Sequence, residues 1–291
     1  MNARDDILFV FFGTGEIARA VLEELLSAGL APSLVVTAPD RKRGRGLSLS
    51  PSPVAARAAE HGLETLKPEK LDDACISKIK TQNSKLFIVA DYGAILSQKL
   101  LNIPEKGTLN MHPSLLPRLR GPSPIRSAIL TDEKRVGVSI MLLDDKMDHG
   151  PIVAQKEVEA PVWPPRGSVL DDVLSHAGGQ LLAQILPLWA RTEIEARPQN
   201  HDLATYCEKF SKEDGLLDLR GDAYQNLLQI RAFEGWPGTY AFFERDGRRI
   251  RAQILDAELE GGQLVIKSVK PEGKKEMSYE QFTRTGAKPL S

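Results

Sequence analysis

The chain has 291 residues, of which 42% are hydrophobic and 26% charged, a composition that excludes disordered, collagen-like and coiled-coil proteins. Its 38 Lys and Arg and 39 Asp and Glu residues leave a formal charge of −1, so a nucleic-acid partner would need a local basic patch. The two cysteines, Cys75 and Cys207, are too few for a disulfide framework or a four-ligand zinc site. With no signal-peptide pattern and no apolar run of membrane length, we expect a cytoplasmic monomer without a membrane partner or a metal.

The first half of the chain alternates strand-like and helix-like segments, which predicts an α/β domain with a mostly parallel, doubly wound (Rossmann-like) sheet. Apolar runs predict strands at residues 7–12, 34–37, 86–90, 107–111, 136–142 and 152–158. Helical spacing predicts helices at residues 16–27, 54–60, 97–101 and 168–191. The last of these helices is expected to be weak at Gly178-Gly179 and kinked or broken at Pro187. The stretch 39–53 lacks periodicity, so we expect a functional or mobile loop there.

The character of the sequence changes near residue 192. Periodicity is lost over 192–204, which predicts a linker. A helix near 223–233 and short alternating runs then predict a small module resembling a β-barrel. We therefore expect a catalytic domain over 1–191, a linker over 192–204 and a β-rich domain over 205–291.

A glycine loop follows the first predicted strand. Gly13-Thr14-Gly15 opens the helix at 16–27, and Asp40 follows the second strand, which matches the spacing of a dinucleotide site. A nicotinamide-dependent oxidoreductase is one interpretation. The alternative is a tight strand-to-helix turn that needs only the backbone freedom of glycine.

Polar side chains gather at a different strand end. If residues 108–112 are extended, Asn110 and His112 share one face at the carboxyl edge of the sheet, where ligands bind in open α/β folds. A second polar segment, 144–150, offers Asp148 as a carboxylate that could orient His112. A metal site and a structural histidine are the competing interpretations. The three side chains suit transfer of an acyl or formyl group to an amine, with Asn110 at the oxyanion and His112 moving protons.

The residues around this strand resemble a known family. The run from Asn110 to Pro117, with Arg120-Gly121, is similar to the signature of formyltransferases that use 10-formyltetrahydrofolate, and the resemblance to methionyl-tRNA formyltransferases extends over nearly the whole chain. The resemblance implies that the catalytic residues are Asn110, His112 and Asp148. It also implies that the folate is bound by Ser114, Leu115, Leu116 and Pro117 and by Ala90, Asp91, Tyr92 and Gly93.

The acceptor is implied by other segments. The run with Arg41, Lys42, Arg43 and Arg45 resembles the tRNA-contacting loop of the family, and the 205–291 domain resembles its tRNA-binding domain. Taken alone, the basic run favours a solvated face. Two residues depart from the family pattern, because Gly15 replaces a common proline and Asp91 replaces a small residue.

The predicted function is transfer of a formyl group from 10-formyltetrahydrofolate to the α-amine of methionyl initiator tRNA, through direct attack and a tetrahedral intermediate. Three alternatives stay open. The acceptor could be glycinamide ribonucleotide or an amino-sugar nucleotide, the enzyme could be the nicotinamide-dependent oxidoreductase, or the chain could bind RNA without catalysis.

Overall fold

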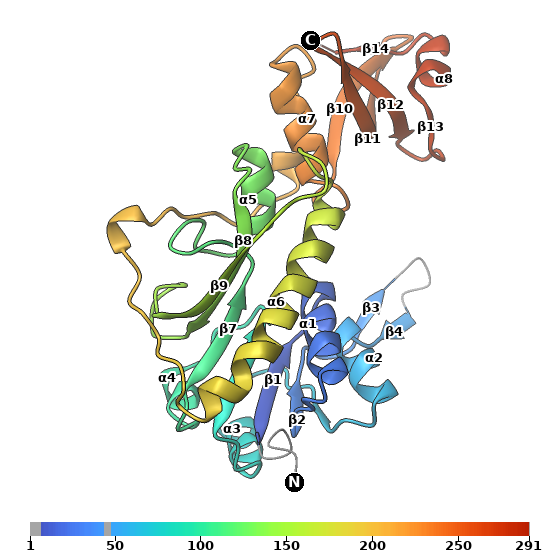
Figure 1. Cartoon of the computed structure of the whole chain (residues 1–291). Helices are drawn as coiled ribbons and strands as arrows, with labels where there is room; N and C mark the ends of the chain where they lie inside the picture. Colours follow the sequence, from blue (N-terminus) through green and yellow to red (C-terminus); the bar gives the residue numbers. More distant parts are fainter. Residues whose placement is uncertain (1–6, 44–47, 291) are drawn as a thin grey trace. The chain divides into compact units, whose positions relative to one another are not determined.

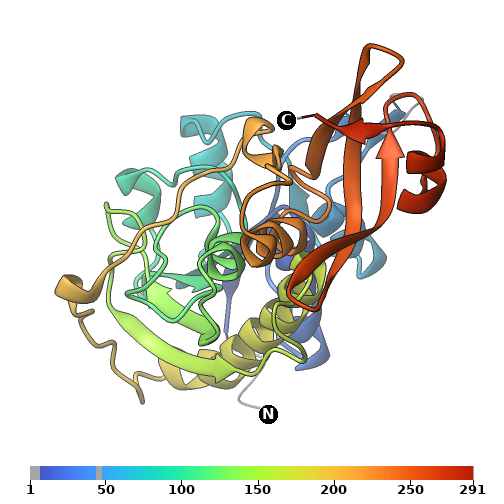
Figure 2. The same cartoon turned by 90° about the horizontal axis from the view of Figure 1, so that it is seen from above.

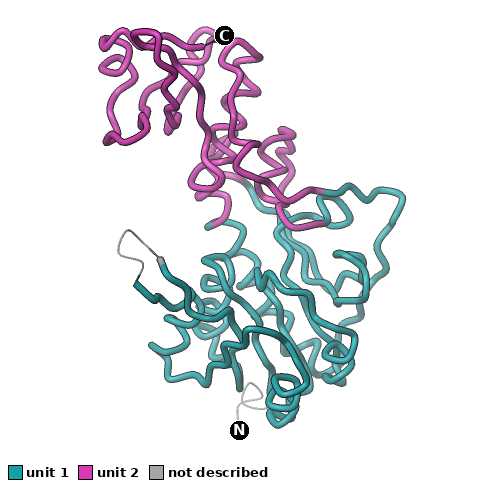
Figure 3. Tube along the Cα trace, turned by 180° about the vertical axis from the view of Figure 1, so that it is seen from behind, with its two compact units in different colours: residues 1–120, 137–159, 172–206 teal, residues 121–136, 160–171, 207–291 magenta. Residues whose placement is uncertain are grey.

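A computed structural model describes residues 7–43 and 48–290. The chain divides into two compact units, which are coloured separately in Figure 3. Unit 1 contains residues 1–120, 137–159 and 172–206, and unit 2 contains residues 121–136, 160–171 and 207–291. The units are therefore interleaved along the sequence.

Unit 1 is built on a seven-stranded sheet with the order β5-β2-β1-β6-β7-β8-β9 (Figure 1). Its strands are β1 (Phe9–Gly13), β2 (Leu34–Val36), β5 (Thr65–Leu66), β6 (Leu86–Ala90), β7 (Thr108–His112), β8 (Val136–Leu142) and β9 (Ile152–Val158). The ladders from β5 to β7 are parallel, whereas β7 and β8 are antiparallel. The mostly parallel sheet confirms the predicted fold class.

Helices cover both faces of this sheet. They are α1 (Glu16–Ser27), α2 (Pro53–Glu60), α3 (Asp73–Lys80), α4 (Gln98–Leu101) and α6 (Gly167–Ala190), of which α6 runs across the strands in Figure 1. One face carries a core in which β1 and β6 pack with α3 and α4. On the other face, Gly178 of α6 contacts Met111 of β7, and Gly179 contacts Glu24 of α1. The strands thus lie between two helical layers, as a doubly wound sheet requires.

Helix α6 differs from its prediction. Pro187 lies inside the helix, which continues to Ala190, so the proline does not end it. The glycine pair, predicted as a weak point, packs closely against neighbouring elements. A Cβ at Gly178 would overlap Met111, and one at Gly179 would overlap the Glu24 side chain. Close packing therefore accounts for these glycines.

Two parts of the stretch 39–53, predicted as a loop, form strands. Strands β3 (Arg41–Arg43) and β4 (Ser48–Ser50) form an antiparallel ladder, with Arg41 opposite Ser50 and Lys42 opposite Leu49. Leu49 and the neighbouring described side chains are largely exposed, so no hydrophobic alternation marks these strands in the sequence. The loop prediction was wrong for these six residues.

Unit 2 contains a five-stranded antiparallel sheet with the order β13-β12-β11-β10-β14, whose long strands lie side by side in Figure 2. Its strands are β10 (Thr239–Arg245), β11 (Arg248–Glu260), β12 (Gln263–Pro271), β13 (Met277–Ser278) and β14 (Lys288–Pro289). Its helices are α5 (Pro124–Leu130), α7 (Ala223–Ala232) and α8 (Tyr279–Arg284). Phe243 and Phe282 pack edge to face in the core of the sheet. Helix α5, which the sequence pattern did not predict, packs against α7.

Candidate active site

Strand β7 carries two of the predicted catalytic residues. Met111 faces α6, so Asn110 and His112 on either side of it point to the opposite face of the sheet. His112 is buried and Asn110 is half-buried. The predicted alternation therefore brings the amide and the imidazole to one face of the strand.

Both ring nitrogens of His112 face a defined partner in unit 1. Nε2 lies 2.9 Å from the carbonyl oxygen of Leu119. A carbonyl can only accept, so Nε2 carries the hydrogen. Nδ1 lies 3.7 Å from Oδ1 of Asp148, an ion-pair distance when the ring is protonated. The ring is thus held between a main-chain acceptor and a carboxylate, and the structure brings together the predicted pair His112 and Asp148.

Asp148 lies in a tight loop after β8. Its φ is +45°, and its side chain is 14% exposed. Gly150 follows at a point where no side chain fits, because a Cβ would overlap the carbonyl oxygen of Leu142. The two ends of the loop are joined by a hydrogen bond, which the Leu142 amide donates to Pro151 O at 2.9 Å. Backbone contacts therefore set the position of the carboxylate.

The predicted folate turn, Ser114 to Pro117, is fixed by a buried hydroxyl. Ser139 Oγ donates to Ser114 O at 2.6 Å and accepts from the Leu116 amide at 3.0 Å. Gln155 Nε2 donates to Leu116 O at 2.8 Å. The bond from Leu116 to Pro117 is cis, and Leu115 is partly exposed. The turn is a rigid element next to His112.

The second predicted folate segment, Ala90 to Gly93, begins at the last residue of β6. Tyr92 is buried, and its burial raises the pKa of the phenol to about 12, so the hydroxyl stays neutral. Thr14 ties this loop to the glycine turn, because its amide donates to Asp91 O at 3.1 Å and its hydroxyl to Tyr92 O at 3.2 Å. Both Asp91 and Gly93 have positive φ.

The two residues that depart from the family pattern touch each other. A Cβ at Gly15 would overlap the Asp91 carboxylate, so the glycine leaves the room that this carboxylate occupies. The carboxylate lies at the start of α1, where a dinucleotide site would hold its pyrophosphate. Asp40, the predicted ribose ligand, instead pairs with Lys67 at 2.7 Å. These contacts disfavour the nicotinamide interpretation.

Three of the four predicted tRNA-binding cations belong to β3. The side chains of Arg41 and Lys42 are exposed. Arg43 belongs to β3, whereas Arg45 lies outside the described residues. Over residues 7–43 and 48–290, no cluster of three His, Cys, Asp or Glu side chains is arranged to hold a metal ion. The helices in those ranges include none with the length and apolar character needed to cross a membrane.

Comparison with known proteins gives the chain its family. A family model described as formyl transferase matches residues 6–182. The chain belongs to the formyl transferase family. A methionyl-tRNA formyltransferase of Chloroflexus aurantiacus is 43% identical over 251 residues, which is 86% of this chain and 81% of the relative. The resemblance inferred from the residues is thereby confirmed, and the chain is an enzyme of this family.

Solved structures share the fold. A methionyl-tRNA formyltransferase from Clostridium thermocellum superposes with a TM-score of 0.61 at 13% identity, covering 91% of this chain and 98% of that one. HypX from Aquifex aeolicus, in complex with tetrahydrofolic acid, gives a TM-score of 0.64 at 15% identity over 94% of this chain and 46% of its own. The formyl transferase fold therefore covers both the sheet of unit 1 and nearly all of the remaining chain.

The sequence did not predict that Arg120, Gln199 and His201 form a hydrogen-bonded group in this formyl transferase. Arg120 is 1% exposed, and its Nε and Nη2 donate to Gln199 Oε1 at 3.1 and 2.6 Å. Its Nη2 also lies 2.9 Å from Nδ1 of His201. Arg120 belongs to the family signature, but Gln199 and His201 fell in the stretch predicted as a linker. No local pattern links residues that are about 80 positions apart.

His201 has an unusual environment for a histidine. Its ring stacks on His149, with centroids 4.1 Å apart and planes 4° apart, and His149 Nδ1 lies 2.7 Å from Asp144 Oδ2. Since arginine only donates, Nδ1 of His201 accepts from Arg120 and the ring is neutral. The pKa of His201 is held below its ordinary value, first by desolvation and then by the neighbouring His149 and Arg120. Lys146 lowers this pKa slightly further, and Asp144 opposes the shift.

We expect an NMR titration to show the pKa of His201 below the ordinary histidine value of about 6.5. His149→Asn should raise it, since one lowering influence is removed. Because the native ring binds protons less readily than the unfolded chain, the contribution of His201 to stability is present above about pH 6.5 and is lost as the pH falls below it. An unshifted or raised pKa in the wild type would contradict this environment.

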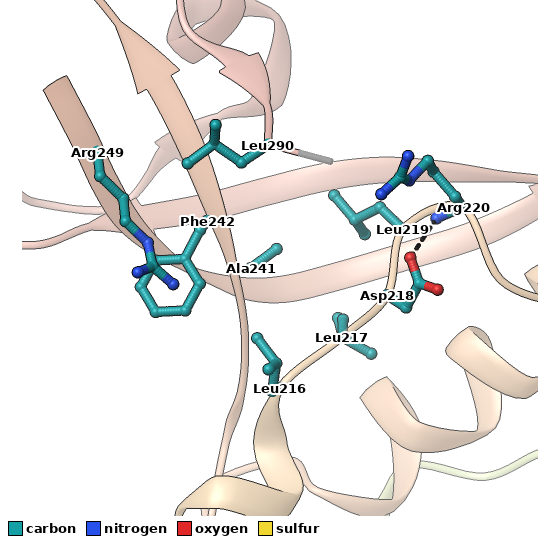
Figure 4. Close-up of a pocket in the computed structure, with 9 residues that line it drawn as sticks. All are labelled: Leu216, Leu217, Asp218, Leu219, Arg220, Ala241, Phe242, Arg249 and Leu290. Atoms are coloured by element: carbon teal, nitrogen blue, oxygen red, sulfur yellow. Dashed lines mark hydrogen bonds between the residues drawn. The ribbon is translucent and has the colours of Figure 1, made fainter. Parts of the chain in front are cut away.

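Unit 2 has a separate cavity of about 640 Å³, shown in Figure 4. Leucines form much of its wall, and Arg249 lies over the ring of Phe242 with its Cζ 3.5 Å from the centroid. On the same pair of strands, Arg251 lies 3.8 Å over the ring of Tyr240. Both arginines are exposed, so β10 and β11 present a short ladder of guanidinium groups stacked on aromatic rings.

Proposed function

We propose that this enzyme transfers the formyl group of 10-formyltetrahydrofolate to the α-amino group of methionyl initiator tRNA. One observation carries the proposal: His112 is held between Leu119 O and Asp148, on the same face of β7 as Asn110, at the carboxyl edge of the sheet. The relatives named methionyl-tRNA formyltransferase support the acceptor, since the match covers 86% of the chain.

The proposed reaction joins the amine nitrogen to the formyl carbon and breaks the bond from that carbon to N10 of the folate. The carbonyl oxygen becomes negatively charged in the tetrahedral intermediate. Asn110 would donate its side-chain N–H to this oxygen, and one such donor contributes about 10²- to 10³-fold in rate. The amine loses a proton and N10 gains one, so a group nearby must move protons.

His112 is the proposed proton carrier. An imidazole can accept and release a proton near neutral pH. Its Nε2 is committed to Leu119 O and Asp148 faces its Nδ1. Asp148 would stabilise the imidazolium formed when the ring takes a proton, and the ring would return that proton to the departing nitrogen. No covalent enzyme intermediate is needed.

The proposed folate site consists of two segments. The turn Ser114 to Pro117 supplies a rigid wall whose inner peptide groups are satisfied by Ser139 and Gln155. The loop Ala90 to Gly93 supplies main-chain donors and acceptors beside the buried ring of Tyr92. A flat ligand with hydrogen-bonding edges fits such a combination of apolar wall and main-chain polar groups.

The proposed tRNA contacts lie on two surfaces. In the catalytic region, 1–191, Arg41, Lys42, Arg43 and Arg45 would reach phosphates. In the region 205–291, the ladder of Arg249 and Arg251 on β11 would stack on or pair with RNA. We propose that the enzyme works as a monomer in the cytoplasm, where charged initiator tRNA is used.

The deciding experiment measures transfer of labelled formyl from 10-formyltetrahydrofolate to methionyl initiator tRNA. Glycinamide ribonucleotide and an amino-sugar nucleotide are tested as acceptors in parallel reactions. Formyl transfer to the tRNA alone is the expected result. Transfer to a small amine only would change the acceptor and keep the chemistry, and no transfer to any of them would refute the proposed reaction.

Neutralising the exposed cations of β3 should weaken tRNA binding. For Arg41→Gln combined with Lys42→Gln, we expect the slope of log affinity against log salt concentration to decrease by about one for each phosphate that the variant no longer neutralises. The affinity for the folate should not change. Lys78→Gln with Lys80→Gln on α3 is a control with the same change of charge. A salt slope equal to that of the wild type would exclude β3 from the RNA contacts.

A further inference from the structure

The segment 197–206, the strap, lies along the loops that hold the catalytic pair. At its start, Arg197 and Ile152 exchange both main-chain hydrogen bonds, at 2.7 and 2.8 Å. Near its end, Thr205 O accepts from the Arg120 amide at 2.9 Å. The strap is therefore hydrogen-bonded to β9 at one end. At its other end it is hydrogen-bonded to Arg120, three residues after the predicted folate turn. All of these residues belong to unit 1.

Gln199 is the buried residue of the strap, with 6% of its surface exposed. Its Nε2 donates to two main-chain carbonyls of the catalytic loop, Asp148 O at 2.8 Å and Gly150 O at 2.7 Å. Its Oε1 accepts from Arg120. Because a guanidinium only donates and a carbonyl only accepts, the Gln199 amide has a single possible orientation, and all four hydrogen bonds are made in it.

The strap also reaches the other partner of His112. Thr205 Oγ1 accepts from the Leu119 amide at 2.8 Å, and Leu119 O is the acceptor for His112 Nε2. Leu119 has a φ of +55°, so its peptide needs such external support. One segment of chain thus fixes the carbonyl that faces Nε2 and the loop whose carboxylate faces Nδ1.

We propose that Gln199, clamped by Arg120, is a positioning residue for the His112–Asp148 pair. This inference rests on the proposed formyl transfer. It assigns a role in that reaction to a residue that contacts neither the substrates nor the imidazole. Gln199 acts through the Asp148 main chain, and it couples that loop to the folate turn through Arg120, the residue that follows Leu119. Its loss would let Asp148 move relative to the ring, and a displacement near 1 Å in such a site costs about 100-fold in rate.

The test uses two variants of Gln199 and one control on the full chain. Gln199→Met keeps the length of the side chain and removes all four of its hydrogen bonds. Gln199→Glu keeps an acceptor for Arg120 but turns an oxygen toward the carbonyls of Asp148 and Gly150. Glu195→Gln is an exposed change a few residues earlier in the chain. For each we measure kcat, both KM values, thermal unfolding and the NMR signal of the His112 Nε2 proton, assigned with His112→Gln.

For Gln199→Met we expect kcat to fall about 100-fold with both KM values unchanged, and the His112 proton signal to shift. Gln199→Glu should lose less thermal stability than Gln199→Met, because Arg120 retains its partner, and should still lose the turnover. That combination would not follow from a purely structural role. Glu195→Gln should match the wild type in all four measurements.

A folded Gln199 variant with wild-type kcat and an unshifted His112 signal would overturn the inference. If Gln199→Met does not fold, Gln199→Glu decides by the same two readouts. If the wild type transfers no formyl group, the proposed function fails, while the NMR signal still reports whether Gln199 positions His112. The two failures are thus distinguishable.

Discussion

His112→Ala is expected to lower kcat for formyl transfer by about 10²- to 10⁴-fold, the range that a positioned acid–base group contributes. The variant removes the ring that lies between Leu119 O and Asp148 and leaves the folate turn in place. We therefore expect the affinity for methionyl-tRNA and for the folate to be retained. Single-turnover rates, with binding measured separately, would show the loss in the chemical step.

Two further variants test whether the loss in His112→Ala comes from proton transfer. His112→Gln can still donate to Leu119 O but cannot carry a proton, so its kcat should fall as far as that of His112→Ala. His61→Ala replaces an exposed histidine after α2 and should have no effect. A turnover for His112→Gln near that of the wild type would show that hydrogen bonding, and not proton transfer, is the role of this residue.

Gly150→Ala is the second change with a large expected effect. A Cβ at this position would overlap Leu142 O, a main-chain atom that cannot rotate away, so the loop that carries Asp148 must move. Overpacking of this kind costs about 1–3 kcal/mol in the free energy of unfolding. Displacement of Asp148 should also reduce kcat by about 100-fold. Chemical denaturation and steady-state kinetics would measure the two effects.

Gly29→Ala separates loss of stability from loss of activity. Gly29 has a φ of +77° with open space around its Cα, so alanine there is strained by its backbone and not by a clash. We expect a stability loss of about 1–2 kcal/mol without a change in kcat. If Gly150→Ala and Gly29→Ala lowered kcat equally, general destabilisation would explain both, and the catalytic loop would have no special sensitivity.

The sequence predicted those parts of the fold that depend on local hydrophobic pattern. Helix α1 has the predicted bounds, Glu16 and Ser27, and β6, β8 and β9 also have the predicted bounds. Strand alternation alone placed Asn110 and His112 on one face, because a period of two is fixed once the strand is extended. The nature of the acceptor came from the family resemblance, not from these patterns.

Other parts depend on contacts between distant residues. Helix α3 escaped prediction although Asp72 caps it, and its buried residues Cys75, Ile76 and Ile79 contact strands that are distant in the sequence. On β3 and β4, none of the side chains that the structure describes is buried. The contact between Gly15 and Asp91 explains two unusual residues at once, but only their spatial proximity shows that they depend on each other. The contact between Gln199 and Arg120 escaped sequence reasoning for the same reason.

The interleaving of the two units limits how this chain can be cut. Within unit 2, Trp163 Nε1 and Tyr224 Oη donate to the same oxygen of Asp132 at 2.6 and 2.8 Å, and α5 packs on α7. A gene fragment ending at residue 204 would retain Asp132 and Trp163 but lose Tyr224 and α7. Exchange of the carboxyl-terminal sheet between relatives would therefore require three matched segments, 121–136, 160–171 and 207–291, and not one continuous cassette.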